Sequence, residues 1–249
     1  MMKDQKNYCV IMAGGIGSRF WPMSKTAYPK QFLDILGTGK SLIRQTFERF
    51  ERICPAENVL VVTNEAYKDL VLAQIPELKE DQILLEPEGR NTAPCIAYAS
   101  YRIAAKTENA NIIVAPSDHL IADVHEFERI ISIALAEAEE TDNLVTLGIN
   151  PSRPDTGYGY IQFEDQVRPR DPAVKHVQAF REKPDLETAK AFVADGNYAW
   201  NAGIFIWSLQ NITAAFEKHL PEMQDLFQES AAAFSTPAEK SAIQLIYGD

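Results

Sequence analysis

Short apolar runs alternate with longer amphipathic segments through the first 150 residues, and this alternation constrains the fold more than any other feature. The apolar runs are mostly β-branched and aliphatic, which is typical of strands buried on both faces. The amphipathic segments carry apolar residues at helical spacing and begin at capping residues such as Ser41. Such alternation predicts a parallel sheet joined by right-handed helical crossovers. The predicted strands are residues 8–12, 59–62, 83–86, 112–115 and 144–149, and the predicted helices are residues 41–52, 65–74, about 92–106 and 126–139.

After residue 150 the pattern changes to strands of antiparallel type followed by helices. Residues 158–163 and 174–180 predict an antiparallel pair, and residues 201–207 return to strand. Asp185 is expected to cap a helix over residues 186–194, and Pro221 and Pro237 divide the helical region beyond. We therefore predict an α/β fold with a Rossmann-like mixed sheet, mainly parallel in the N-terminal half, with helices on both faces.

The first predicted strand runs directly into a glycine-rich turn. Gly14, Gly15 and Gly17 fall within four positions, and Arg19 and Lys30 follow. Glycine lets a ligand approach bare backbone, and consecutive amides in such a turn can form an anion-binding concavity. The spacing matches neither the dinucleotide fingerprint nor the P-loop. Glycines alone would indicate an ordinary turn, but the added cations favour a cradle for a nucleoside triphosphate.

Polar residues follow two further predicted strands. Arg90 and Asn91 follow the third strand, and Asp118 follows the fourth. Ligands of parallel sheets bind outside the carboxyl ends of the strands, so these residues should converge with the glycine turn. A carboxylate there can hold Mg²⁺ while phosphates and water complete the octahedron. In isolation Asp118 would be a turn or cap residue, but beside a phosphate cradle it is predicted to bind Mg²⁺.

Composition and charge exclude several functional classes. The formal net charge is −11 and no basic run occurs, which argues against nucleic acid or an anionic membrane as the main partner. No apolar stretch approaches membrane-spanning length, the N-terminus lacks a signal-peptide pattern, and the three cysteines form no disulfide pattern. We therefore expect a cytoplasmic protein that holds a polyanion through local positive charge and a divalent cation.

The second half carries groups suited to a hydroxyl-rich ligand. Gly157, Tyr158 and Gly159 offer bare backbone beside an aromatic ring, which an edge strand with packed tyrosines would explain equally well. Residues 182–184 place Glu182 and Lys183 at a strand end, where the alternative is a solvated surface pair. Residues 200–203 include an amide that can both donate to and accept from hydroxyls, although turn chemistry would also use it.

Taken together, these motifs resemble those of the nucleotide-sugar pyrophosphorylases, and within that family the members that act on mannose 1-phosphate. The resemblance covers nearly the whole chain in order and spacing. At positions 18, 20 and 25 serine, phenylalanine and lysine replace the usual threonine, leucine and arginine, and we expect these changes to be tolerated. The matching blocks are residues 14–22, 29–32, 86–87 with 90–94, 116–119, 157–161, 182–184 and 200–203.

The resemblance implies that GTP and mannose 1-phosphate react to give GDP-mannose and pyrophosphate, with Mg²⁺ as cofactor. We assign catalysis to Arg19, Lys30, Asp118 and Lys183, with Asp118 as the metal ligand. The remaining assignments are Ala13, Gly14, Gly15, Gly17, Ser18, Arg19, Lys30, Arg90 and Asn91 for the nucleotide, and Gly157, Tyr158, Gly159, Glu182, Asn201 and Gly203 for the sugar.

In domain terms, residues 1–249 are interpreted as one catalytic domain, with a nucleotide-binding half to about residue 150 and a sugar-binding half from about residue 151. The family continues into a second metal-binding aspartate and a β-helix domain, so the chain is expected to be truncated at its C-terminus. A homodimer is a possible assembly.

Four other interpretations stay open at this stage. The chain could serve another pair of sugar 1-phosphate and nucleotide, such as glucose 1-phosphate with UTP, or bind nucleotide-sugars without catalysis. A metal-dependent glycosyltransferase is less compatible, because its Asp-x-Asp motif does not follow the fourth predicted strand. A hydrolase using Asp118 and Glu182 would leave the glycine turn unexplained. Assays of all four triphosphates with several sugar phosphates distinguish the substrate pairs, and calorimetry distinguishes binding from catalysis.

Overall fold

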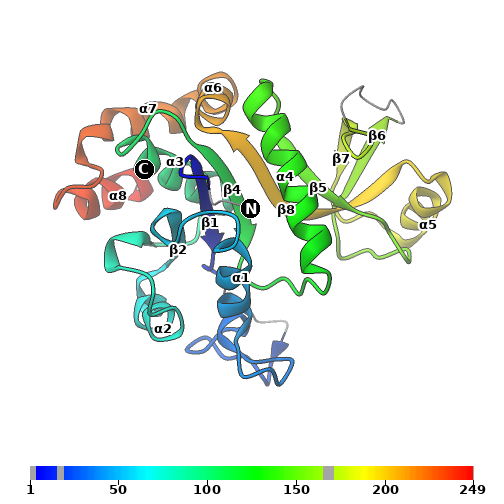
Figure 1. Ribbon diagram of the computed structural model, residues 1–249, viewed down its shortest axis with the longest axis horizontal. Helices are drawn as coiled ribbons and strands as arrows, with labels where there is room; N and C mark the ends of the chain where they lie inside the picture. Colours follow the sequence, from blue (N-terminus) through cyan, green and yellow to red (C-terminus); the bar gives the residue numbers. More distant parts are fainter. Residues whose placement is uncertain (1–3, 16–19, 165–170, 249) are drawn as a thin grey trace.

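The computed structural model describes residues 4–15, 20–164 and 171–248. Its centre is an eight-stranded mixed sheet in the order β3-β2-β1-β4-β8-β6-β7, with β5 paired to β8 beside this path (Figure 1). The strands are β1 (Asn7–Met12), β2 (Val59–Asn64), β3 (Ile83–Glu86), β4 (Asn111–Pro116), β5 (Val145–Ile149), β6 (Tyr160–Glu164), β7 (His176–Arg181) and β8 (Tyr198–Ser208).

The first four strands form the predicted parallel sheet. β1 lies in the middle and pairs in parallel with β2 and β4, while β3 extends the sheet beyond β2. Because these strands are parallel, their carboxyl ends all lie along one edge. The helices between them are α1 (Leu42–Phe50), α2 (Lys68–Gln74), α3 (Thr92–Ala104) and α4 (Val124–Glu140), with short 3₁₀ turns at Lys30–Phe32, Ala56–Asn58, Glu65–Tyr67 and Glu80–Gln82.

The prediction that the fifth strand would also be parallel is wrong. β5 pairs antiparallel with β8, and β8 in turn pairs antiparallel with β4. The long strand β8 therefore lies between β4 and β5, so the chain leaving α4 meets β8 rather than the parallel sheet. Alternation along the sequence could not reveal this, because β8 comes about 50 residues after β5 and supplies the pairing edge.

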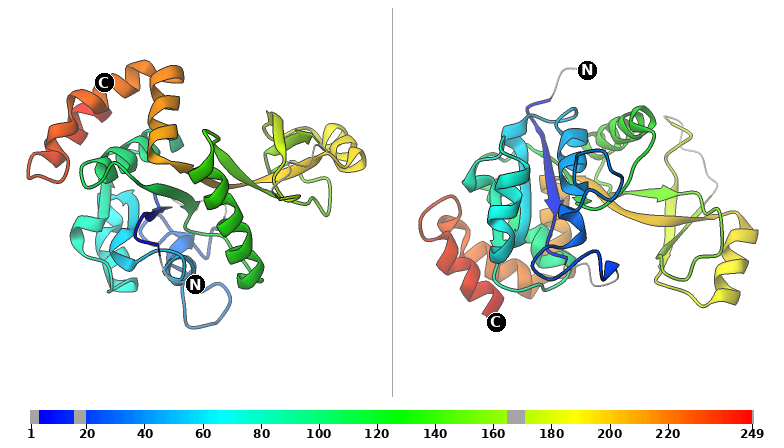
Figure 2. Two further views of the ribbon diagram at one scale, coloured as in Figure 1. Left: turned by 45° about the horizontal axis from the view of Figure 1, so that its top comes forward. Right: turned by 90° about the horizontal axis from the view of Figure 1, so that it is seen from below.

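Helices cover both faces of the sheet, as predicted. Along β1, Cys9 and Ile11 point to a core that includes residues of α1, α2 and α4, whereas Tyr8 and Val10 point to a core beneath α3 and the C-terminal helices. Figure 2 shows the orange to red helices on one side of the sheet, with α1 and α4 on the other. The C-terminal region comprises α6 (Leu209–His219), α7 (Pro221–Glu229), a 3₁₀ turn (Ala231–Ala233) and α8 (Glu239–Gly248), and Pro221 begins α7.

An outer lobe extends from the far end of β8 (Figure 1). It consists of the antiparallel pair β6 and β7 and the helix α5 (Leu186–Asp195). Tyr160, Ala189 and Trp200 form its small core, with Phe192 stacked on Tyr198 at 4.0 Å. Its strands and helix match the elements that the sequence predicts beyond residue 150.

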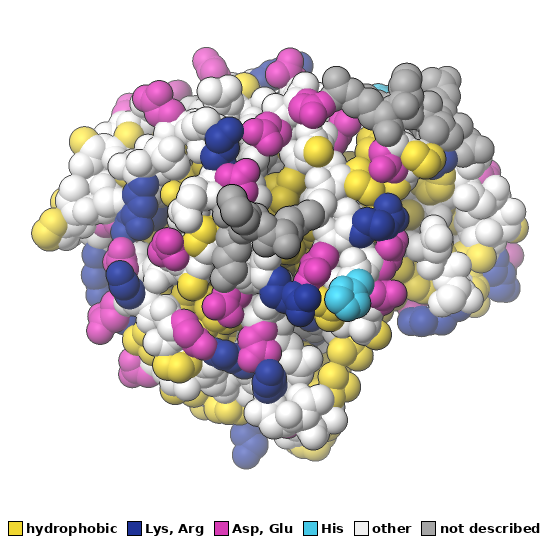
Figure 3. Space-filling view, in the orientation of Figure 1, with side chains coloured by type: hydrophobic (Ala, Val, Ile, Leu, Met, Phe, Trp, Pro, Cys, Tyr) yellow, Lys and Arg dark blue, Asp and Glu magenta, His cyan; other side chains and the backbone are white. Residues whose placement is uncertain are grey.

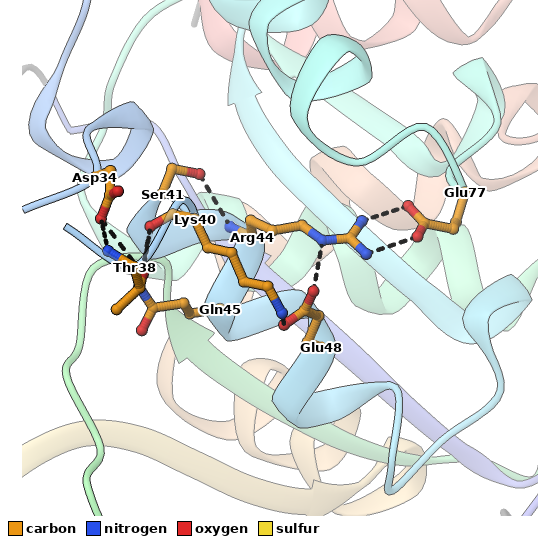
Figure 4. A network of polar contacts seen from close by, with 8 residues as sticks. All are labelled: Asp34, Thr38, Lys40, Ser41, Arg44, Gln45, Glu48 and Glu77. Carbon is orange, nitrogen blue, oxygen red and sulfur yellow. Dashed lines mark hydrogen bonds and ion pairs between the residues drawn. The ribbon is translucent and has the colours of Figure 1, made fainter. Parts of the chain in front are cut away.

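Helix α1 is fixed at its start by a network of polar contacts (Figure 4). The Ser41 hydroxyl accepts a hydrogen bond from the Arg44 backbone N–H, which confirms the predicted cap. The Arg44 guanidinium binds both carboxylate oxygens of Glu77, at 2.5 and 2.8 Å, and also Glu48. Bidentate pairs of this kind are geometrically specific. Helix α1 is therefore a rigid support for whatever contacts it.

Helix α3 begins without a side-chain cap. Asn91 occupies the N-cap position with φ of 66°, and its side chain makes no capping hydrogen bond. Asparagine tolerates this left-handed region better than most residues. Over the described residues, no helix is both long and apolar enough to cross a membrane.

Candidate functional site

The glycine-rich turn begins at the carboxyl end of β1, where side chains from neighbouring elements fix its backbone. The buried amide of Gln31 donates to the carbonyls of Ala13 and Gly15, at 3.0 and 2.9 Å. Thr63 of β2 also donates to the Ala13 carbonyl. Gly14 and Gly15 therefore leave the sheet in a fixed direction. The predicted nucleotide-binding residues Gly17, Ser18 and Arg19 lie outside the described residues.

Lys30 and Asp118 meet at this edge of the sheet. The Lys30 Nζ lies 2.5 Å from an Asp118 carboxylate oxygen, and the two side chains are 31% and 24% exposed. They come from the 3₁₀ turn after the glycine loop and from the loop after β4. The structure thus places side by side two residues that the sequence assigns to catalysis, although they are 88 positions apart.

Helix α1 holds the loop that carries Asp118. The Thr46 hydroxyl donates to the Ser117 carbonyl at 3.2 Å, and the Arg49 guanidinium donates to the His119 carbonyl at 3.3 Å. Both neighbours of Asp118 are therefore tied to one helix face. Burial lowers the pKa of His119, which favours its neutral form. Neither contact was foreseen from sequence, because Thr46 and Arg49 lie within an ordinary amphipathic helix.

A cavity of about 660 Å³ opens beside the glycine turn. Gly14, Asn64, Tyr67, Glu86 and Gly89 contribute to its lining. These residues end β2 and β3 or follow β1, β2 and β3, so the cavity lies along the predicted ligand-binding edge. Its size falls within the range of small-molecule sites in proteins.

Glu86 is the buried charge of this cavity, with 7% of its surface exposed. Its Oε1 accepts a hydrogen bond of 2.6 Å from the Tyr247 hydroxyl. Its Oε2 faces Gly14, because a Cβ built on that glycine would lie 3.6 Å away. Burial raises the pKa of Glu86, and the hydrogen bond from Tyr247 opposes this rise. No role was assigned to Glu86 from sequence; an acidic residue ending a buried apolar strand was the available signal.

Arg90 and Asn91 are not brought into this cavity. The Arg90 guanidinium pairs with Glu88 at 2.6 Å on the surface, and Asn91 is turned into the start of α3. Their neighbour Gly89 contributes to the lining instead.

Four residues that the sequence assigns to the sugar lie together in the second half. The Asn201 backbone N–H donates to the Gly159 carbonyl at 2.8 Å, and the Gly203 N–H donates to Asn201 Oδ1 at 2.9 Å. Glu182 approaches so closely that a Cβ on Gly159 would lie 2.8 Å from its Oε2. A larger residue at Gly159 would require the exposed Glu182 carboxylate to shift, whereas the φ of 64° at Gly203 itself favours glycine.

The other predicted residues of this half surround the same cluster. The Gly157 N–H donates to Asp155 at 2.8 Å, and the Tyr158 ring lies 5.1 Å from the Trp200 ring. The Lys183 Nζ pairs with Glu182 at 2.7 Å, and both side chains are more than half exposed. Lys183 is thus placed beside the sugar-assigned cluster.

Strand register brings the two clusters to the same region of the sheet. Val114 of β4 pairs with Phe205 of β8 in antiparallel register. This is the last registered pair: Pro116 follows Val114 by two residues in β4 and Gly203 precedes Phe205 by two residues in β8, so both lie beyond it on the same side. The amide and glycine of β8 therefore border the carboxyl end of β4. Figure 3 shows basic and acidic side chains intermixed on the face seen in Figure 1, with no broad basic patch.

Fold and geometry together define an α/β protein with a cavity at the carboxyl ends of parallel strands and an outer lobe that carries a cluster of polar groups. Comparison with known proteins gives the family: the nucleotidyl transferase model matches residues 8–239, and the chain belongs to this family. The family resemblance found in the sequence motifs is confirmed. Members of this family generally use a divalent metal ion.

Relatives of known name are similar over most of the chain. It is 39% identical over 239 residues to mannose-1-phosphate guanylyltransferase of Escherichia coli. The matched region covers 93% of this chain and 49% of the relative. It is 40% identical over 230 residues to mannose-1-phosphate guanylyltransferase ManC of Salmonella typhimurium, covering 90% and 47%. The chain thus spans about half the length of these curated relatives.

A solved structure shares the fold closely. The crystal structure of mannose-1-phosphate geranyltransferase from Thermus thermophilus superposes with a TM-score of 0.85 at 31% identity, covering 98% of this chain and 68% of the other. The α/β fold with a central mixed sheet, as predicted, is confirmed.

Proposed function

We propose that this protein transfers a guanylyl group from GTP to mannose 1-phosphate, giving GDP-mannose and pyrophosphate. The observation that carries the proposal is the pairing of Lys30 with Asp118 beside the glycine turn, at 2.5 Å. An ordinary strand-to-helix turn needs neither a cation nor a carboxylate at this point. A triphosphate with a divalent cation needs both. The two named guanylyltransferases among the relatives support the choice of substrates.

The reaction requires positioning and charge neutralisation rather than a general base. Mannose 1-phosphate is already an anionic nucleophile, and one of its oxygens attacks the α-phosphorus of GTP in line while pyrophosphate leaves. We propose that backbone amides of residues 14–17 cradle the triphosphate. Arg19 would contact the β- and γ-phosphates, and Lys30 and Lys183 would neutralise the reacting groups.

We propose Mg²⁺ as the divalent cation, with Asp118 as its protein ligand. Over the described residues, no group of three His, Cys, Asp or Glu side chains could enclose a metal by itself. Magnesium fits such a site, because it is commonly bound by one or two carboxylates together with substrate phosphates and water. When bound, it would neutralise phosphate charge.

Guanine preference is proposed to rest on Glu86. Among the common bases, guanine alone presents two adjacent donors, N1–H and the 2-amino group, on its pairing edge. A carboxylate can accept both, as a bidentate pair. On the same edge, adenine and cytosine present a donor beside an acceptor, and uracil presents a donor between two acceptors. Each of these bases would therefore place an acceptor opposite a carboxylate oxygen, where the two repel each other.

The mannose is proposed to lie against the cluster on β8 and the outer lobe. Glu182 and Asn201 would bind sugar hydroxyls, with backbone at Gly157, Gly159 and Gly203 and the ring of Tyr158 nearby. This assignment divides one catalytic domain into a nucleotide-binding half to about residue 150 and a sugar-binding half beyond it. Because nucleoside triphosphates and sugar phosphates are cytoplasmic metabolites, we also propose a cytoplasmic location.

The test is pyrophosphate release with GTP, ATP, UTP or CTP, each combined with mannose 1-phosphate or glucose 1-phosphate. We expect the highest kcat/KM with GTP and mannose 1-phosphate, and a loss of about 100-fold or more in the Asp118→Asn variant, which keeps size but not charge. Preference for another pair would overturn the substrate assignment. GTP binding in a calorimeter without pyrophosphate release would instead support a binding module.

A further inference from the structure

Tyr247 lies far from Glu86 in sequence but touches it in the fold. It belongs to α8, the last helix, and only 3% of its surface is exposed. Its hydroxyl donates a 2.6 Å hydrogen bond to Glu86 Oε1, inside the protein rather than at its surface. No motif in the sequence singles out this tyrosine.

Helix α8 is anchored independently of Glu86. Glu239 at its start accepts a hydrogen bond from the Tyr98 hydroxyl at 2.9 Å and lies 3.1 Å from the Arg102 guanidinium. Ile243 and Ile246 pack into the core that α3 shares. Because both ends of the helix are fixed, the Tyr247 hydroxyl has little freedom to move away from the carboxylate.

The two carboxylate oxygens of Glu86 therefore face different surroundings. Oε1 is held by Tyr247, whereas Oε2 faces Gly14, and among the described residues none donates a hydrogen bond to it. The last torsion of a glutamate side chain is broad, so an unrestrained carboxylate would sample many orientations. A hydrogen bond to a charged acceptor is among the stronger ones in proteins and can select one of them.

We propose that Tyr247 is a positioning residue for base recognition: it orients the Glu86 carboxylate so that guanine is distinguished from bases lacking the 2-amino group. This inference rests on the proposed function, because it takes Glu86 as the group that binds guanine. Tyr247 itself need not touch the nucleotide. One carboxylate oxygen has two lone pairs, so Oε1 can accept from Tyr247 and from the base together.

The test compares GTP with ITP, which differ only by the 2-amino group. The specificity ratio of their kcat/KM values is measured in the wild type, Tyr247→Phe, Glu86→Gln and the double variant. We expect Tyr247→Phe to reduce the ratio by about 5- to 10-fold, which is within the net contribution of one typical hydrogen bond. Glu86→Gln should reduce it further, and the loss in the double variant should be smaller than the product of the two single losses, because Tyr247 acts only through residue 86.

The matched control is Tyr101→Phe. Tyr101 is also buried, but its hydroxyl contacts Gln228 and not a residue of the cavity. We expect its ratio to equal that of the wild type. A Tyr247→Phe variant that slows GTP and ITP equally, or effects of the two substitutions that multiply in the double variant, would overturn the proposal.

Binding of GTP and ITP by calorimetry gives the same ratio without turnover. If the wild type binds GTP more tightly than ITP but releases no pyrophosphate, the catalytic proposal fails while a reduced ratio in Tyr247→Phe still supports positioning. Equal binding of the two nucleotides by the wild type overturns the positioning role. Should Tyr247→Phe fail to fold, Tyr247→Met, an apolar side chain of similar length, is measured in the same way, with the same two outcomes.

Discussion

Glu86, which we propose binds guanine, is a buried residue whose charge has a cost for stability. Its carboxylate is almost fully buried, and desolvation disfavours its charged form. Burial accordingly raises its pKa above the ordinary value of 4.5. A group whose pKa is raised in the folded state contributes most to stability at low pH, and this contribution is lost as pH rises through the folded pKa. At neutral pH the charge on Glu86 therefore destabilises the fold.

We predict that Glu86→Gln raises the melting temperature at pH 7 by about 1 to 4 °C while weakening GTP binding. Glutamine keeps an oxygen that can accept the Tyr247 hydroxyl, but it carries no charge to desolvate. Differential scanning calorimetry of both proteins between pH 4 and 8 is the measurement. The difference should be small near pH 4 and grow as Glu86 ionises in the wild type. A variant less stable than the wild type at every pH would contradict this account.

The sequence predicted which candidate site residues lie near strand ends, but it could not predict the directions in which their side chains point. Lys30 and Asp118 could both be assigned to this edge of the sheet, Lys30 from its motif and Asp118 from its place after a strand, but their direct pairing was not predicted. Arg90 and Asn91 also follow a strand, yet the backbone at Asn91 turns into α3 and Arg90 pairs with Glu88. Strand position fixes the edge on which a residue lies, but the loop torsions decide where its side chain points.

At the scale of elements, α1 connects the stable part of the sheet to the Asp118 loop. Arg49 is buried and has one carbonyl contact, to His119, among its described hydrogen bonds. Burial lowers the pKa of Arg49, which reflects the desolvation of its charge. A buried guanidinium is unfavourable for folding unless its contacts compensate. A buried arginine is explained at this position if its contact with the His119 carbonyl holds the loop that positions Asp118.

We predict that Arg49→Met lowers kcat about 10-fold with little loss of thermal stability, because methionine fills apolar space but leaves the His119 carbonyl unbound. Steady-state kinetics with GTP and mannose 1-phosphate, beside thermal unfolding, are the measurements. Arg52→Met is the control, since Arg52 lies near the end of the same helix but pairs with Glu128. Equal losses of kcat in the two variants would show that the contact with the loop is unimportant.

The secondary-structure elements could be predicted from the sequence, but not all of their pairings could. The strands, helices and most of their boundaries follow from local periodicity, which each segment carries by itself. The direction of β5 does not, because its partner β8 comes from the other half of the chain. Pairing between distant segments depends on the tertiary arrangement, and local periodicity carries no information about it.

At the scale of the whole molecule, β8 joins the two halves, since it pairs with β4 in the parallel sheet and with β6 in the outer lobe. If nucleotide and sugar bind to different halves, hydrogen exchange should separate them. We predict that GTP with Mg²⁺ slows exchange about 10-fold or more in residues 13–15 and 116–119, and that mannose 1-phosphate does so in residues 157–161 and 200–203, because bound ligand suppresses local opening. Mass spectrometry of peptides from each half, with either ligand alone, is the measurement. Protection of the same peptides by both ligands would contradict the division, whereas separate protection would identify β8 as the strand along which the two substrates approach each other.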